Sequence, residues 1–119
     1  MKLICLIENT AVDEKLYSEN GVSFFVEFGG KYYLIDTGLT GKAAENARRM
    51  KLPLDSLSGV VITHNHAAHI GGIDNIMRLS PDADIYIRAA AQTEYWKKNG
   101  FMKQPAGAGK GFFKKYADR

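Results

Sequence analysis

All three histidines of this chain lie within six residues, at His64, His66 and His69, and Gly71-Gly72 follows them directly. The segment before them, Gly59-Val60-Val61-Ile62-Thr63, is an apolar, β-branched run typical of a buried strand. A turn that leaves a buried strand is held by the sheet, so it can direct several side chains to one place. We therefore expect a fold in which the end of a buried strand places the histidines at an edge of the sheet.

The spacing of the histidines favours a metal site. His64 and His66 are two residues apart, so in an extended segment their side chains lie on the same side. His69 follows at the entry to a predicted helix. Imidazole nitrogens bind zinc and other borderline divalent metals. The alternative is a chance cluster of surface histidines. The position between strand and helix instead predicts His64, His66 and His69 as ligands of a divalent metal. Zinc is the preferred metal, with iron and manganese as alternatives.

The remaining elements predict an α/β fold. Apolar and alternating runs indicate further strands, a Gly29-Gly30 turn joins two of them as a hairpin, and helical spacing of apolar residues indicates three helices. Because the hairpin strands precede alternating helices and strands, we expect a mixed sheet. The predicted strands are 2–7, 22–28, 31–35, 59–63 and 84–88, and the predicted helices are 41–52, 73–79 and 89–98.

Length and composition are those of one globular domain. The chain has 119 residues, of which 45% are hydrophobic and 24% charged. No apolar stretch approaches the roughly 18–20 residues of a membrane span. Cys5 is the single cysteine, so no disulfide framework is indicated, and its apolar surroundings predict a buried structural thiol. We therefore expect no membrane association and a cytoplasmic location.

Charge divides the chain into two parts. Residues 97–119 carry seven lysines or arginines against one aspartate, whereas residues 1–96 carry nine against twelve acidic residues. We predict a half-domain over residues 1–100 and a basic tail rich in glycine, lysine and aromatic residues over 101–119. A basic tail can contact nucleic acid. We prefer a solvated surface segment, because no nucleic-acid-binding motif accompanies it.

The histidine segment resembles a family signature. Thr63 to Gly72 spells Thr-His-x-His-x-x-His-x-Gly-Gly, which resembles the metallo-β-lactamase superfamily motif Thr-His-x-His-x-Asp-His-x-Gly-Gly, and Leu34-Ile35-Asp36-Thr37-Gly38 also matches that family. Glu8-Asn9-Thr10 and residues 23–27 resemble the subgroup of dihydropterin ribofuranosyl-aminobenzene phosphate synthase. The resemblance implies a metallo-β-lactamase-like αββα sandwich, of which this chain supplies one half, a mixed sheet with helices on one face.

The resemblance also implies roles for the site residues. His64 and His66 would bind a first metal, and His69 a second metal together with the motif aspartate. Asp36 would orient a ligand from behind, and the alternative for Asp36 is a helix N-cap or turn carboxylate. The metals would polarise a carbonyl or phosphoryl oxygen in a hydrolysis reaction.

Two departures weaken this implied activity. Ala68 stands where the family has its aspartate, and the chain is shorter than family members, whose second half supplies the other ligands. We therefore assign no catalytic residue and expect a metal-dependent hydrolase that is weak or inactive alone. The alternative is a non-catalytic half-domain that dimerises and binds at most one metal. A homodimer or a complementary second-half chain would cover the face of the sheet that the predicted helices leave uncovered. The resemblance does not identify the small-molecule substrate.

Overall fold

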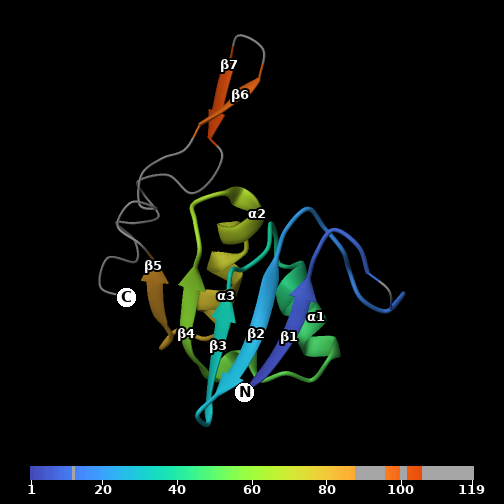
Figure 1. The fold of residues 1–119 in the computed structure, drawn as a ribbon, viewed down its shortest axis with the longest axis vertical. Coiled ribbons are helices and arrows are strands. Elements are labelled where there is room, and N and C mark those ends of the chain that lie inside the picture. The colour runs from blue at the N-terminus through green and yellow to red at the C-terminus, as the bar shows by residue number, and fades with distance from the viewer. Residues whose placement is uncertain (12, 88–95, 100–101, 106–119) are drawn as a thin grey trace.

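A mixed five-stranded sheet organises the chain. The computed structural model describes residues 1–11, 13–87, 96–99 and 102–105. Its main sheet has the order β1-β2-β3-β4-β5 (Figure 1). The first three strands are antiparallel, and the last two run parallel to β3. This is the predicted α/β fold with a mixed sheet. The strands are β1 (Lys2–Ile7), β2 (Ser23–Phe28), β3 (Lys31–Ile35), β4 (Leu57–Ile62) and β5 (Asp84–Ile87).

The turn between β2 and β3 is the predicted two-residue hairpin. Gly29 and Gly30 have φ angles of +60° and +75°, which side chains other than glycine rarely adopt. Phe28 and Lys31 pair across the turn, so the register of the hairpin is fixed at its closed end.

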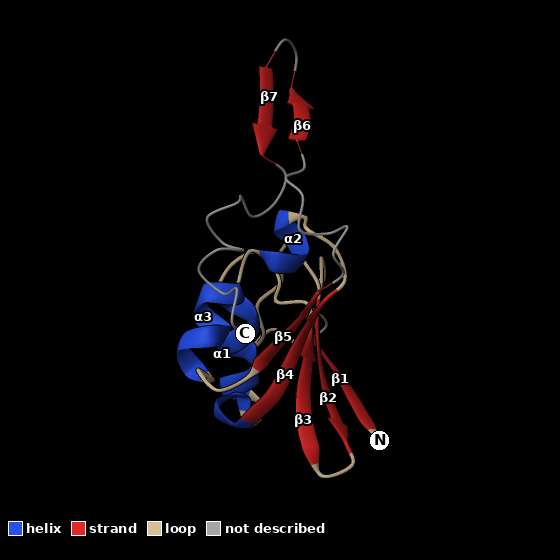
Figure 2. Ribbon diagram, turned by 90° about the vertical axis from the view of Figure 1, so that its left-hand side faces the viewer, coloured by secondary structure: helices blue, strands red, loops and turns tan. Residues whose placement is uncertain are grey.

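The helices all lie on one face of the sheet or at its upper edge (Figure 2). They are α1 (Lys42–Arg49), the 3₁₀ turn η1 (Leu54–Ser56), α2 (Ala67–Ile70) and α3 (Ile73–Leu79). The predicted helix 41–52 is shorter than expected at its end, because Lys51 takes a left-handed conformation with a φ of +59°. The chain therefore leaves the helix before Pro53.

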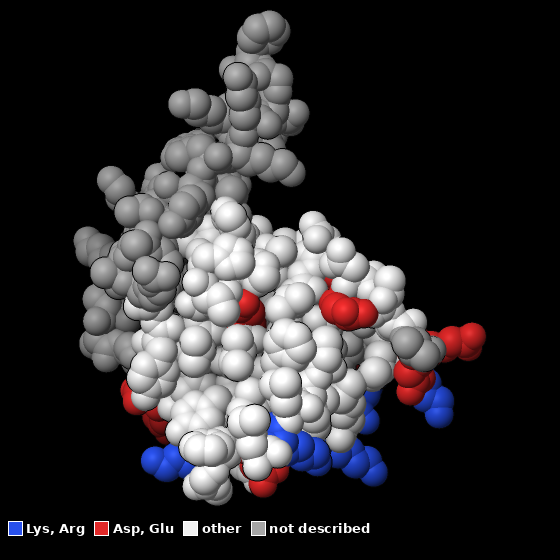
Figure 3. Space-filling model, in the orientation of Figure 1, with Lys and Arg blue, Asp and Glu red and all other residues white. Residues whose placement is uncertain are grey.

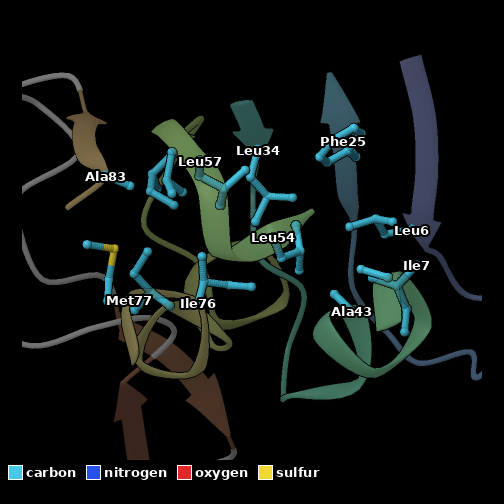
Figure 4. Packing of buried hydrophobic residues seen from close by; sticks show 14 of the residues in the cluster. Leu6, Ile7, Phe25, Leu34, Ala43, Leu54, Leu57, Ile76, Met77 and Ala83 are labelled. Carbon is cyan, nitrogen blue, oxygen red and sulfur yellow. The ribbon is translucent and has the colours of Figure 1, made fainter. Parts of the chain in front are cut away.

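The hydrophobic core fills the space between this face and the helices (Figure 4). Phe25 and Leu34 point to it from neighbouring strands, and Ala43 and Ile76 meet them from α1 and α3. Alternate strand positions are buried, so only one face of the sheet is covered by the described helices. This half-covered sheet holds the site, because the turn after β4 lies at its edge.

Two expectations from the sequence are wrong. Trp96–Asn99 forms β6, which pairs antiparallel with β7 (Met102–Pro105), so the helix predicted over 89–98 is wrong over 96–98. The dipeptide Asn99-Gly100 suits both the end of a helix and the turn of a hairpin, so the local sequence does not distinguish the two. Residues 89–95 and the aromatic part of the tail lie outside the described residues. The division at residue 100 stays a prediction.

The second error concerns Cys5, which is exposed instead of buried. A continuous apolar run suggested a strand covered on both faces, but β1 is covered on only one, and Cys5 points to the other. No helix in the described part of the chain has the length and apolar character needed to span a membrane.

Candidate metal centre

The histidine segment lies at the carboxyl ends of two parallel strands. β3 ends at Ile35 and β4 at Ile62, and the chain then turns into the short helix α2 (Figure 1). His66 precedes α2 in an extended conformation, and its carbonyl accepts hydrogen bonds from the backbone N–H groups of His69 and Ile70, at 2.9 and 3.0 Å. The strand and the turn are found as the sequence predicts, and the predicted helix over 73–79 follows as α3 after the additional short helix α2.

This turn brings the three imidazole rings together. The ring centroids of His64 and His66 are 4.7 Å apart, with the planes nearly perpendicular. Those of His64 and His69 are 4.0 Å apart, with the planes tilted by 49°. The structure therefore makes the three predicted ligands neighbours.

The rings are closer than metal ligands would be. Among the described residues, no three His, Cys, Asp or Glu side chains have the arrangement of a complete metal site. Two imidazoles on one tetrahedral ion have centroids about 5 Å apart. The 4.7 Å between His64 and His66 is close to that separation, whereas the 4.0 Å between His64 and His69 is about 1 Å shorter.

The protonation state of His64 suits metal binding. Burial lowers its pKa below the ordinary value of 6.5, and the neighbouring His69 and His66 lower it further, while Asp36 opposes them. The neutral imidazole is therefore favoured, and this is the form whose nitrogen lone pair a metal requires.

The carboxylate of Asp36 contacts both Thr63, at the start of the histidine turn, and His69. Its Oδ1 accepts the backbone N–H of Thr63 at 2.8 Å, and its Oδ2 accepts the Thr63 hydroxyl at 2.7 Å. The same Oδ2 lies 2.7 Å from Nδ1 of His69, and the carboxylate is 3% exposed. A carboxylate that accepts from Nδ1 leaves Nε2 of the imidazole as the nitrogen available to a metal. Asp36 contacts the turn and not a helix N-terminus, so both a turn carboxylate and a residue that orients His69 are compatible with its contacts.

The backbone of Asp36 explains how the carboxylate reaches the turn. Its φ is +59°, a left-handed conformation uncommon outside glycine, although aspartate tolerates it better than most residues. Its N–H donates to the carbonyl of Val61 at 2.8 Å, and its carbonyl accepts the hydroxyl of the fully buried Ser23 at 2.8 Å. Both backbone groups fix this conformation. The local sequence around Ser23 gives no indication of this contact with Asp36.

The Gly-Gly pair of the motif is a packing requirement. A Cβ on Gly71 would lie 2.2 Å from the carbonyl oxygen of Leu39, and one on Gly72 would lie 2.3 Å from that of Thr37. The loop after β3 can therefore cross α2 in direct backbone contact, and the Thr37 N–H donates to the His69 carbonyl at 2.7 Å. The position of His69 thus depends on Thr37, Gly71 and Gly72, none of which is a proposed metal ligand.

Ala68 supplies backbone contact only. Its carbonyl accepts the N–H of Val22 at 3.1 Å, which ties α2 to the start of β2. Its side chain is a half-buried methyl group at the position where the family motif has a carboxylate. The departure noted in the sequence therefore lies within α2, one residue before His69.

A family model and two curated relatives match parts of this chain. The family model described as the metallo-beta-lactamase superfamily matches residues 17–113. Anti-Pycsar protein Apyc1 of Bacillus phage 010DV004 is 36% identical over 77 residues, which cover 64% of this chain and 28% of the phage protein. Exodeoxyribonuclease YycJ of Bacillus anthracis is 36% identical over 59 residues, which cover 49% of this chain and 22% of that enzyme.

Solved structures show the same fold. Tm1679, described as a metal-dependent hydrolase of the beta-lactamase superfamily, superposes with a TM-score of 0.72 at 26% identity, over 96% of this chain and 39% of that one. MEM-A1, a subclass B3 metallo-beta-lactamase from a soil metagenome library, has a TM-score of 0.56 at 19% identity, over 74% and 37% of the two chains. The chain spans between 22% and 39% of the lengths of these four proteins.

Proposed function

Since the chain belongs to the metallo-β-lactamase superfamily, we propose that His64, His66 and His69 hold divalent metal, preferentially zinc, in a hydrolase site. The observation that carries this proposal is the convergence of the three rings, with Nδ1 of His69 held by Asp36. Iron and manganese are alternatives, because imidazole also suits them.

Each residue has a distinct task in this proposal. His64 and His66 hold a first metal through ring nitrogens, and His69 offers Nε2 to a second. Asp36 fixes the orientation of His69 and, through Thr63, the start of the turn. A bound divalent metal supplies a Lewis acid that polarises a carbonyl or phosphoryl oxygen of the substrate.

Ala68 limits what these residues can do. A methyl group cannot coordinate a metal, so the second metal position has only His69 from this turn. We therefore propose that hydrolysis by residues 1–119 alone is weak or absent. The alternative is a non-catalytic domain that binds at most one metal. The other histidine ligands that the resemblance implies are not in this sequence, which has three histidines.

A phosphodiester is the substrate class with specific support. The relative named exodeoxyribonuclease is 36% identical to this chain over 59 residues, and a Lewis acid that polarises a phosphoryl oxygen suits that chemistry. Placement in the dihydropterin ribofuranosyl-aminobenzene phosphate synthase subgroup stays a prediction, since neither relative named above carries that description. A cytoplasmic location also stays a proposal, which rests on the single Cys5.

Metal analysis tests the proposal. The chain is equilibrated with zinc, freed of unbound ion and analysed by plasma mass spectrometry, and we expect about one zinc per chain. A His64→Ala/His66→Ala variant should retain far less. A Glu45→Gln/Arg48→Gln variant, which alters an exposed ion pair on α1, is the matched control and should bind as the parent does. Equal zinc content in the histidine variant, or none in the parent, would contradict the proposal.

A further inference from the structure

The loop that follows β3 lies between two other parts of the chain at the upper end of the sheet (Figure 1). We call residues 37–40 the β3 loop. On one side of it is the short helix α2, and on the other is the stretch before β2, residues 19–22. The N–H of Gly38 donates to the carbonyl of Val22 at 2.9 Å, and the N–H of Val22 donates to the carbonyl of Ala68 at 3.1 Å. The three segments are therefore joined by their backbones.

The carboxylate of Glu19 accepts three hydrogen bonds from the β3 loop. Its Oε1 accepts the backbone N–H groups of Leu39 and Thr40, at 3.0 and 3.2 Å, and its Oε2 accepts the Thr40 hydroxyl at 2.7 Å. The backbone N–H of Glu19 donates to the carbonyl of Glu8 at 3.1 Å, directly after β1. Hydrogen bonds to an ionised acceptor are about twice as strong as those between neutral groups. Glu19 therefore joins the end of β1 firmly to the β3 loop.

Two glycines allow this close approach. Gly38 has a φ of +74°, and a Cβ at this position would lie 2.8 Å from Oε1 of Glu19. A Cβ on Gly21 would lie 2.8 Å from the backbone nitrogen of Leu39 and 2.9 Å from the carbonyl oxygen of Ala68. Any other residue at either position would separate the segments. The backbone around Glu19 is thus packed against both the β3 loop and α2.

The β3 loop in turn holds the main chain of His69. The backbone N–H and the hydroxyl of Thr37 both donate to the His69 carbonyl, at 2.7 and 3.0 Å, and the same hydroxyl accepts the N–H of Gly72 at 3.1 Å. Thr37 is fully buried, so water does not compete for these bonds. Asp36, next to Thr37, contacts the ring of the same histidine. A shift of the β3 loop would therefore move His69.

Lysine and arginine have no part in this arrangement on the side of the molecule that Figure 3 views. Their side chains gather at the lower edge and the right-hand side of that face, away from the upper edge where α2 lies (Figures 1 and 3). Among the described residues, lysine and arginine form ion pairs only within α1, where Arg48 and Arg49 contact Glu45. The partners of the Glu19 carboxylate are thus the donors of the β3 loop.

We propose that Glu19 is a positioning residue of the metal centre, because its carboxylate fixes the β3 loop and the loop fixes His69. The role of His69 as a ligand rests on the proposed function, whereas the link from Glu19 to His69 involves no metal. Without the carboxylate, three donors of the loop lose their acceptor and Thr37 holds His69 less firmly. A glutamate that only stabilised the fold would leave the ligand geometry of the folded chain unchanged.

Hydrogen exchange in the metal-free chain tests the link, because exchange rates report local opening. In Glu19→Ala, the Thr37 N–H should exchange at least fivefold faster than in the parent. The N–H of Asp36, which donates to Val61 within the sheet, should keep its rate. Glu14→Ala alters an exposed glutamate of the same connection and is the matched control. An unchanged rate at Thr37 would overturn the proposal, as would equal acceleration at Thr37 and Asp36, which would indicate destabilisation of the whole fold.

Zinc affinity, measured by chelator competition under conditions in which every variant is folded, tests the consequence for the metal centre. Glu19→Ala should weaken binding about tenfold, the lower end of the effect of residues behind a metal ligand. Ser80→Ala is the control for stability, because it removes a buried hydroxyl that contacts Leu57 at the opposite end of β4. It should bind zinc as the parent does. Equal affinities of Glu19→Ala and the parent, or equal losses in Glu19→Ala and Ser80→Ala, would overturn the proposal.

A double variant tests whether the effect passes through His69. In a His69→Ala background, Glu19→Ala should change the remaining zinc affinity by less than about twofold, because the two substitutions interrupt the same path. A tenfold loss in that background would overturn the proposal. Failure of the proposed function has a different signature: the parent would bind no zinc, and the exchange rate of the Thr37 N–H would then decide whether Glu19 positions His69.

Discussion

Oδ2 of Asp36 lies 2.7 Å from Nδ1 of His69, although the two residues are 33 positions apart in the sequence. The same carboxylate accepts the backbone N–H and the hydroxyl of Thr63. One buried carboxylate therefore holds the histidine turn at its first residue and at its last histidine.

Asp36→Asn should weaken zinc binding about 10- to 100-fold, the usual effect of removing a carboxylate behind a histidine ligand. Asparagine tolerates the left-handed backbone of this position, so the backbone should remain in place. The neutral amide can no longer fix His69 with Nε2 free. Competition with a zinc chelator measures the affinity, and Asp55→Asn, in the short turn η1, is the control. An unchanged affinity in Asp36→Asn would show that the contact does not position a ligand.

Ala68→Asp should increase metal uptake. It supplies the carboxylate that the family motif has beside His69, so zinc content should rise above that of the parent chain. Ala67→Asp places the same charge one residue earlier on α2 and is the matched control, because adjacent helix positions point about 100° apart. Plasma mass spectrometry gives the stoichiometry, and hydrolysis of bis(p-nitrophenyl) phosphate reports any gain in phosphodiester cleavage. If both variants gained metal equally, charge and not ligand geometry would explain the effect.

Gly72→Ala should lower the free energy of unfolding by about 3 kcal/mol or more, because its Cβ would lie within 2.4 Å of two backbone carbonyl oxygens. Gly29→Ala should lower it by only about 1 kcal/mol, since that site has a positive φ but open space around it. Urea denaturation compares the two variants. A smaller loss for Gly72→Ala than for Gly29→Ala would mean that the loop over α2 can move away from it.

The reactivity of Cys5 should show a raised pKa. Although Cys5 is exposed, partial burial of its sulfur raises the pKa of the thiol above the ordinary value of 9.0, and the negative charge of Glu8 raises it further. Because the thiolate is the reactive form, the alkylation rate of dilute protein should reach its midpoint above pH 9.0. Glu8→Gln should move the midpoint down, whereas Glu14→Gln should leave it unchanged. A midpoint at or below pH 9.0 in the parent would contradict this prediction.

Much of the sheet could be predicted from local sequence. The hairpin at Gly29-Gly30 and the strand before His64 follow from turn chemistry and from β-branched runs, and both are found where expected. The helix predicted over 73–79 is α3, whereas the four-residue α2, which contains His69, comes before it and has no counterpart in the prediction. The hairpin and the strand depend on residues that are near one another in the chain.

The contacts that form the site were less predictable, because they join distant segments. The left-handed Asp36 and the bond from Thr37 to the His69 carbonyl have no local pattern. Asp36 was expected only through the family resemblance. The helix predicted over 96–98 failed because local propensity did not distinguish a helix end from a hairpin at Asn99. The exposure of Cys5 depends on which face the helices cover, which no single strand reveals.

The helix α2 has four residues, and its carbonyls are tied by N–H groups from Val22 and Thr37. A helix this short has no stability of its own in water. The arrangement of the histidines therefore depends on the folded sheet, in which strands far apart in the chain have met. A synthetic peptide spanning residues 59–72 would contain every proposed ligand and still lack their geometry.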